Sequence, residues 1–122
     1  MDSVPVPLVL LDTDLRVTWA SPSFYETFQL TPEETISHFV YEMGNGRWSL
    51  PALRGALTEV LEKNVGFHEF EVEDDYARVE AKTMLLNARP MRWEQKAGPL
   101  ILLAIDDITA RKKAERYLGA SE

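Results

Sequence analysis

The spacing of apolar and polar residues changes several times along the chain, and each change marks a structural element. Residues 8–11 form a short apolar run, which ends at Asp12-Thr13-Asp14, a sequence typical of turns. Residues 15–19 then alternate between apolar and polar, the period of a strand with one buried face. Two such strands joined by a tight turn predict an antiparallel hairpin.

Three helix starts follow, and each has a proline in its first turn. Ser21 precedes Pro22, and Thr31 precedes Pro32 with a glutamate three residues after the threonine, as in a capping box. The third and longest helix begins at Pro51. Its apolar stripe recurs at helical spacing and consists of Leu53, Leu57, Val60 and Leu61.

The second half of the chain has the patterns of strands. Residues 67–73 alternate, with three glutamates on one face, which we interpret as a solvated acidic face. Alternate residues of a strand lie about 7 Å apart, too far for these carboxylates to share one cation without further ligands. Residues 78–91 predict a long strand, and a polar loop spans 93–99. Residues 100–108 are apolar at almost every position, which predicts a central strand covered on both faces.

Composition limits the chemistry. The chain has 122 residues, enough for one domain, and no cysteine, which removes disulfides, thiolate metal sites and cysteine nucleophiles. Its net charge of -7 argues against nucleic acid as a partner. No apolar run approaches the roughly 18 residues of a membrane span, and no signal peptide is evident, so we expect a cytoplasmic location without membrane contact.

Four short segments, in order, resemble the PAS domain. They are the hairpin at residues 10–17, Ala20-Ser-Pro-Ser-Phe24 at a helix start, Leu50-Pro-Ala-Leu-Arg54, and Asp107-Ile-Thr109 followed by Arg111. The last is similar to the Asp-Ile-Thr-x-Arg signature that closes bacterial PAS domains. The resemblance implies an α+β fold with a five-stranded antiparallel sheet in the order 2-1-5-4-3, short helices over one face and a C-terminal exit helix. It places the sensor domain at 5–109 and the start of the signalling helix at 110–122.

The resemblance also implies a function. We expect a non-enzymatic input module of a bacterial sensor histidine kinase or related regulator of a two-component phosphorelay. It would act as a homodimer and pass a change through the last strand to a C-terminal effector. The alternative is a dimerisation or protein-docking module without a ligand. An enzyme would need a catalytic set of side chains, and no Ser-His-Asp group or metal cluster stands out.

A ligand would occupy the space between helices and sheet, and would be small and mostly apolar. The candidate lining residues are Phe24, Phe28, Phe39, Trp48, Leu53, Leu57, Leu86, Asn87 and Leu102. The same residues would also serve as an ordinary core. The face on which Asn87, the one polar candidate, lies is not fixed by the pattern.

The cofactor is left open by the sequence. Covalent flavin chemistry in the family uses a cysteine in an Asn-Cys-Arg-Phe motif, and this chain has none, so we exclude it. Flavin held without a covalent bond remains an alternative. Haem-binding relatives use a histidine on the long helix, which has none here; His38 precedes that helix, and we expect His68 on the inward side of its strand.

Three residues at the start of the exit helix are candidates for signal coupling: Asp107, Thr109 and Arg111. The Thr109 hydroxyl is placed to cap the helix, and Asp107 lies where the helix dipole favours negative charge. Arg111 stands against that dipole, so we expect it to pair with a carboxylate. Plain helix capping is the alternative interpretation.

Overall fold

The computed structural model describes residues 6–42, 50–74, 82–92 and 98–120. Within these ranges the strands are β1 (Leu8–Leu11), β2 (Val17–Ala20), β3 (Phe67–Asp74), β4 (Lys82–Arg92) and β5 (Pro99–Asp107). The helices are α1 (Pro22–Phe28), α2 (Pro32–Thr35), the 3₁₀ turn η1 (Val40–Glu42), α3 (Pro51–Lys63) and α4 (Thr109–Ala120). Trp48, the first residues of the strand expected at 78–91 and most of the loop at 93–99 lie outside the described residues.

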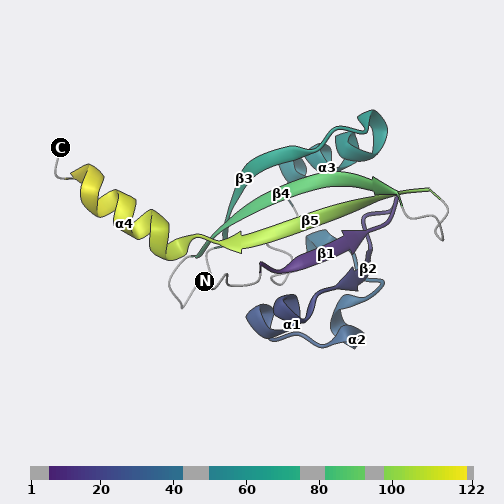
Figure 1. Ribbon diagram of the computed structural model, residues 1–122, viewed down its shortest axis with the longest axis horizontal. Coiled ribbons are helices and arrows are strands. Elements are labelled where there is room, and N and C mark those ends of the chain that lie inside the picture. Colours follow the sequence, from purple (N-terminus) through teal and green to yellow (C-terminus); the bar gives the residue numbers. More distant parts are fainter. Residues whose placement is uncertain (1–5, 43–49, 75–81, 93–97, 121–122) are drawn as a thin grey trace.

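The five strands form one antiparallel sheet in the order β2-β1-β5-β4-β3 (Figure 1). The expected strand order and the central position of the last strand are therefore confirmed. β5 pairs with β1 on one side and with β4 along its whole length on the other. Leu102 lies opposite Leu10 on β1 and opposite Arg89 on β4, so these three residues form one row across the sheet.

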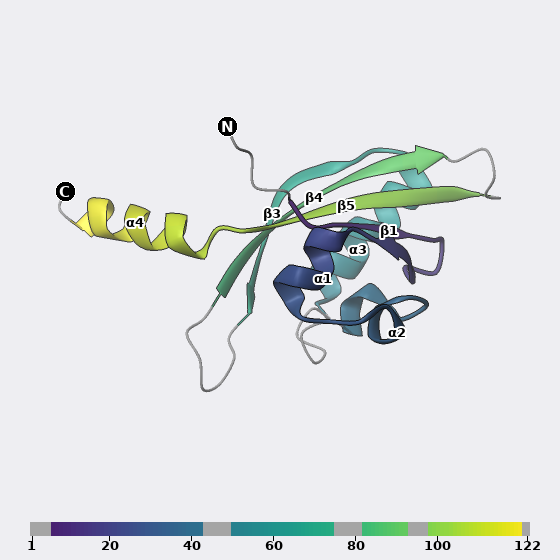
Figure 2. The ribbon, with the colours of Figure 1, turned by 60° about the horizontal axis from the view of Figure 1, so that its bottom comes forward.

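Helices α1, α2 and α3 cover one face of the sheet, here called the inner face (Figure 2). In the middle of the central strands, every second residue points to this face and is buried, as the two-residue period of a strand requires. On β5 these residues are Ile101, Leu103 and Ile105. From the helices, the fully buried side chains Phe24, Leu53 and Leu57 pack on them. Burying such large apolar side chains is the main contribution to the stability of the fold.

The intervening residues point to the opposite side, here called the outer face. They include Leu10 on β1, Asn87 and Arg89 on β4, and Leu102 and Ala104 on β5. None of the described helices covers this face (Figure 2). The exit helix α4 instead projects beyond the end of the sheet (Figure 1). In the part of the chain that the structure describes, no helix is long and apolar enough to cross a membrane.

All three predicted helix starts are confirmed, and two of them have the expected capping hydrogen bonds. The Phe24 amide donates to the Ser21 hydroxyl, and Thr31 and Glu34 form both bonds of a capping box. The second strand begins later than expected, at Val17. Leu15 has a φ of 67°, so it belongs to the turn, and its buried side chain explains why it resembles a strand residue.

Candidate functional site

The predicted ligand-lining residues lie in different environments. Phe24, Leu53, Leu57 and Leu86 are all 0% exposed and belong to the single core between helices and sheet. A side chain that its neighbours cover completely borders no space large enough for a water molecule. These four residues therefore pack as an ordinary core, which is the alternative that the sequence left open.

The other aromatic candidates lie at the rim of that core. Phe28 is half-buried, with its ring centroid 4.9 Å from that of Phe24. Phe39 is also half-buried and stacks on Tyr41 at 4.9 Å, while the Arg16 guanidinium lies 3.9 Å from the Phe39 ring centroid. This cation–π contact ties the rim to the hairpin turn. Trp48 lies outside the described residues.

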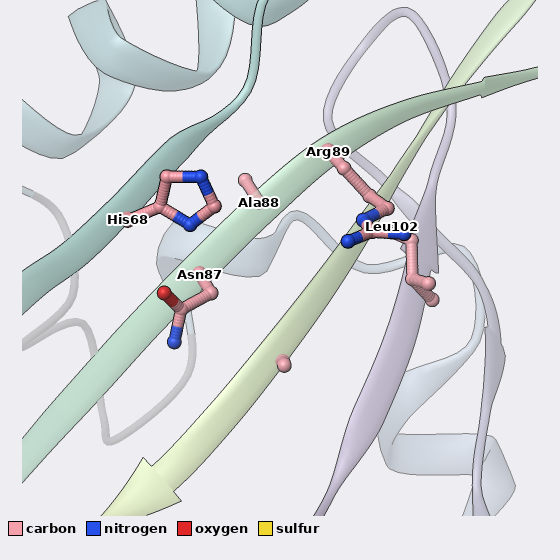
Figure 3. A pocket seen from close by; sticks show the side chains of 6 residues that line it. His68, Asn87, Ala88, Arg89 and Leu102 are labelled. Atoms are coloured by element: carbon pink, nitrogen blue, oxygen red, sulfur yellow. The ribbon is translucent and has the colours of Figure 1, made fainter.

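Two candidates, Asn87 and Leu102, lie on the outer face, so Leu102 does not line the space between helices and sheet as we expected. An uninterrupted apolar strand does not reveal which of its residues face the helices. His68 was expected on the inward side of its strand, and it is exposed instead. These three residues line one hollow of about 310 Å³ on the outer face, together with Arg89, Ala104 and the Ala88 segment (Figure 3).

A β-bulge explains the position of His68. The pairing of β3 with β4 shifts register between Phe67 and Phe70, and Glu69 has a φ of 59°. As a result His68 and Glu69 are both exposed, whereas Phe67 and Phe70 both pack on the core. The Asn87 Oδ1 atom accepts a hydrogen bond from the Glu69 amide at 3.0 Å and holds the bulge. A non-glycine residue in this conformation gives no warning in the sequence.

The residues at the start of α4 are brought together, with roles that differ from those expected. Asp107 Oδ1 accepts from the Thr109 amide at 3.0 Å and from the Thr109 hydroxyl at 2.6 Å. Asp107 is therefore the capping side chain. The Thr109 oxygen does not cap the helix, because it accepts from the Thr83 amide of β4 at 3.0 Å instead. Thr109 thus ties the first turn of α4 to the sheet.

The expected carboxylate partner of Arg111 is absent among the described residues. Its neighbour Lys112 forms the ion pair instead, with Nζ 3.3 Å from Glu71 on β3. One helical turn later, Arg116 lies 4.0 Å from Glu73 on the same strand. The acidic face of β3, which the sequence suggested was merely solvated, therefore faces α4.

A spacing rule could have found these ion pairs. Residues four apart on a helix are separated by about 6 Å along its axis, and residues two apart on a strand by about 7 Å. A basic pair at 112 and 116 therefore matches an acidic pair at 71 and 73. The exposed geometry limits each pair to about 0–1 kcal/mol.

A second, smaller hollow lies beside this junction. It has a volume of about 170 Å³ and brings Phe28 of α1 near Asp107 at the end of β5. Its other lining residues are Val6, Pro7, Thr27, Met84, Ile105 and Asp106. One predicted ligand candidate and one predicted coupling residue thus share a surface.

Polar chemistry inside the described core is sparse. Ser21 and Thr35 are buried, and both hydroxyls are bonded to the backbone of their own helix starts. Burial, and secondarily the Glu33 carboxylate, raises the pKa of the Tyr25 hydroxyl. Among the described residues, no three histidine or acidic side chains are grouped closely enough to hold a metal ion. This interior packs side chains rather than presenting reactive groups.

Comparison with known proteins identifies the fold. The family model described as PAS fold matches residues 1–113. Among solved structures, a light-oxygen-voltage (LOV) protein of Rhodobacter sphaeroides is 19% identical with a TM-score of 0.66, over 88% of this chain and 61% of that one. An RNA-binding light-oxygen-voltage receptor is 14% identical with a TM-score of 0.72, over 94% of this chain and 32% of that one. A fungal LOV domain photoreceptor is 14% identical with a TM-score of 0.63, over 82% and 74%.

No curated protein matches the chain. The chain spans about three-fifths of the Rhodobacter protein and a third of the RNA-binding receptor. The comparisons correct one expectation from the sequence. The cofactor was left unidentified there, with non-covalent flavin as one alternative. The similar solved structures are LOV domains, a class that binds flavin. The covalent link of that class needs a cysteine, and this chain has none.

Proposed function

Because the chain belongs to the PAS fold family, whose domains are regulatory sensor modules and not enzymes, we propose that its output element is α4. In this proposal a change in the sheet passes through β5 to α4 and on to an effector such as a bacterial histidine kinase. The observation that carries it is the Thr109–Thr83 hydrogen bond, which joins the first turn of the exit helix to the neighbouring strand. Movement of β4 relative to β5 would therefore displace the first turn of α4.

The connection between β5 and α4 is short and held on both sides. Ile108 is the single residue between the end of β5 and the start of α4, and its side chain is buried. Its carbonyl accepts the first helical bond, from the Lys112 amide at 2.9 Å, and its amide donates to the Thr83 carbonyl at 2.9 Å. Thr83 is thus bonded on both sides of its backbone to the junction. The two ion pairs to β3 add a weaker contact one and two turns further along.

The far part of α4 supports a homodimer as the working form. Tyr117 and Leu118 are 84% and 71% exposed, unusual for large apolar side chains. With Ala110 and Ala114 they follow helical spacing and form one stripe. A stripe this narrow suits a helix that pairs with its copy. The effector would then receive two helices in a fixed relation.

Thr109→Val tests the coupling with little change of shape. It removes the acceptor of the Thr83 amide, and an unsatisfied, partly buried amide costs about 1–3 kcal/mol. We expect the amides of α4 and of the start of β4 to exchange hydrogen at least about tenfold faster, while β1 and the middle of β5 keep their protection. Thr58→Val is the matched control, since its hydroxyl bonds only to the Arg54 carbonyl in its own helix.

Two results would count against this proposal. One is unchanged exchange in α4 of Thr109→Val, which would mean that the hydroxyl does not hold the helix. The other is loss of protection throughout the sheet, which would make Thr109 a residue of general stability. With an effector attached, the same substitution should make effector activity independent of the input.

A docking or dimerisation module without a ligand is the second candidate, and the closed core favours it. Native mass spectrometry compared with the denatured mass separates the two. An extra mass that leaves on denaturation would establish a ligand and give its size. A bare mass, in monomer or dimer, would leave docking as the input.

Flavin needs a separate examination because of the similar solved structures. Its ring would find apolar contacts on the inner face, but its polar edge needs hydrogen-bond partners. Among the described residues of β4 and β5 that are buried on the inner face, every side chain is apolar. Asn87, the polar candidate, points to the outer face. The described residues therefore do not by themselves form a flavin site, and visible absorption of the purified protein would test binding directly.

A further inference from the structure

The hollow on the outer face has a composition unlike the rest of the molecule. The chain carries 20 acidic residues, yet no carboxylate lines this hollow. Its polar side chains are instead His68, Asn87 and Arg89, which come from β3 and β4 (Figure 3). The imidazole and the carboxamide lie on one side, and the guanidinium lies on the other beside Leu102 (Figure 3).

The donors of these side chains are available. Asn87 uses its Oδ1 atom to accept from Glu69, which leaves the two hydrogens of Nδ2 without a partner among the described residues. Within the same part of the chain, neither Arg89 nor His68 takes part in an ion pair or a side-chain hydrogen bond. Glu71, which follows the bulge on β3, forms an ion pair with Lys112.

The floor of the hollow is formed by apolar side chains, one of which is small. Ala104 lies directly between Leu8 and Asn87 in the register of the sheet, and its small side chain leaves room above the strand. Leu102 forms the adjacent apolar wall. A volume of about 310 Å³ is at the lower end of the range for small-molecule sites. The shape therefore suits a short apolar body with a polar end.

The backbone beside the hollow has a strained conformation that determines which way the side chain of His68 points. Glu69 occupies a left-handed conformation that costs a non-glycine residue about 1–2 kcal/mol, and such strain concentrates at functional sites. The bulge turns His68 to the outer face. Gly66 lets β3 approach β4 closely, since a Cβ atom there would lie 2.3 Å from the Ala88 carbonyl oxygen. These features together fix His68 beside Asn87.

We propose that this hollow binds a small organic carboxylate. The carboxylate would accept hydrogen bonds from the Arg89 guanidinium and the Asn87 Nδ2 group, with the imidazole of His68 beside them. Its apolar body would lie on Ala104 and Leu102. Arginine is suited to this role because its planar fork matches the two oxygens of a carboxylate. The site is on the opposite side of the sheet from the core and does not depend on the output role proposed for α4.

Titration with sodium benzoate and sodium butyrate, followed by amide shifts in ¹H–¹⁵N NMR spectra, tests the proposal. We expect saturable shifts confined to residues 68, 87–89 and 102–104. Benzamide and butyramide serve as neutral probes of the same shape, and sodium chloride at equal ionic strength controls for salt. The carboxylates should bind at least about tenfold more tightly than the amides, because hydrogen bonds to a charged acceptor are stronger.

Two substitutions distinguish recognition from mere charge. Arg89→Gln should weaken binding about tenfold or more, since it removes the cation and the fork. Arg92→Gln, an exposed arginine of the same strand that does not line the hollow, is the control and should change nothing. Asn87→Asp keeps an oxygen for the Glu69 amide, and therefore the bulge, but replaces the donors by a negative charge. It should abolish binding.

The proposal would be overturned by any of three results. The first is no saturable shift at these residues with either carboxylate at tens of millimolar. The second is equal affinity for the amides, which would make the hollow a purely apolar site. The third is an equal effect of Arg89→Gln and Arg92→Gln, which would mean that only overall charge matters.

Discussion

The two faces of the sheet are made by the same strands and differ in almost every other respect. On the inner face, the buried alternate residues of β4 and β5 are all apolar and belong to one core, which they share with side chains of the helices. On the outer face, the intervening residues include a carboxamide, an arginine and partly exposed apolar side chains around a hollow. In this chain the inner face serves stability, and the polar groups with spare hydrogen-bonding capacity lie on the outer face.

The largest test of this contrast uses neighbouring leucines of β5. Leu103→Ala removes a side chain that is 0% exposed in the core, and such substitutions cost about 2–5 kcal/mol. Leu102→Ala makes the same chemical change on the half-buried outer face, where we expect about 1 kcal/mol or less. Chemical denaturation of both variants measures the difference. Equal losses would show that the outer face is also covered in solution.

Alanine substitutions at two glycines should change stability by smaller amounts and in opposite directions. Gly66→Ala places a Cβ atom against the Ala88 carbonyl and should destabilise the protein by about 1–3 kcal/mol, with shifts in the amides around the hollow. Gly55→Ala, in the interior of α3 with nothing within 4 Å of the new atom, should stabilise it by about 0.5–1 kcal/mol. If both variants were stabilised, the close approach of β3 to β4 would be dispensable.

The smallest effect concerns the rim of the inner face and appears only at high pH. Because its folded-state pKa is raised above 10.0, the Tyr25 hydroxyl stays neutral in the folded protein after it ionises in the unfolded chain. Its contribution to stability is therefore complete below about pH 10 and is lost as the pH rises through the folded-state pKa. Tyr25→Phe should flatten the decline of unfolding free energy above pH 10, and Glu33→Gln should flatten it less. An unchanged slope in Tyr25→Phe would exclude this titration.

Much of the fold could be predicted because its signals are local. Ser21 and Thr31 cap helices through bonds that a few adjacent residues determine, and the apolar run at 100–108 required a central strand. The faces of that strand could not be assigned, because Leu102 and Leu103 are chemically identical and only pairing with β4 separates them. His68 was misplaced because a bulge breaks the two-residue period. Arg111 was expected to pair because it belongs to the Asp-Ile-Thr-x-Arg signature, and that signature does not show that β3 lies beside Lys112.

The junction at Ile108 also has a mechanical consequence. A helix of 12 residues is about 18 Å long, so α4 extends from a point that one residue connects to the sheet. A rotation of about 10° at that point would displace the far end of the helix by about 3 Å, more than half of one helical turn. The exit helix is therefore a lever arm whose pivot is a single buried isoleucine. A rearrangement among strands too small to alter their pairing would reach the far end of α4 as a displacement of several ångströms.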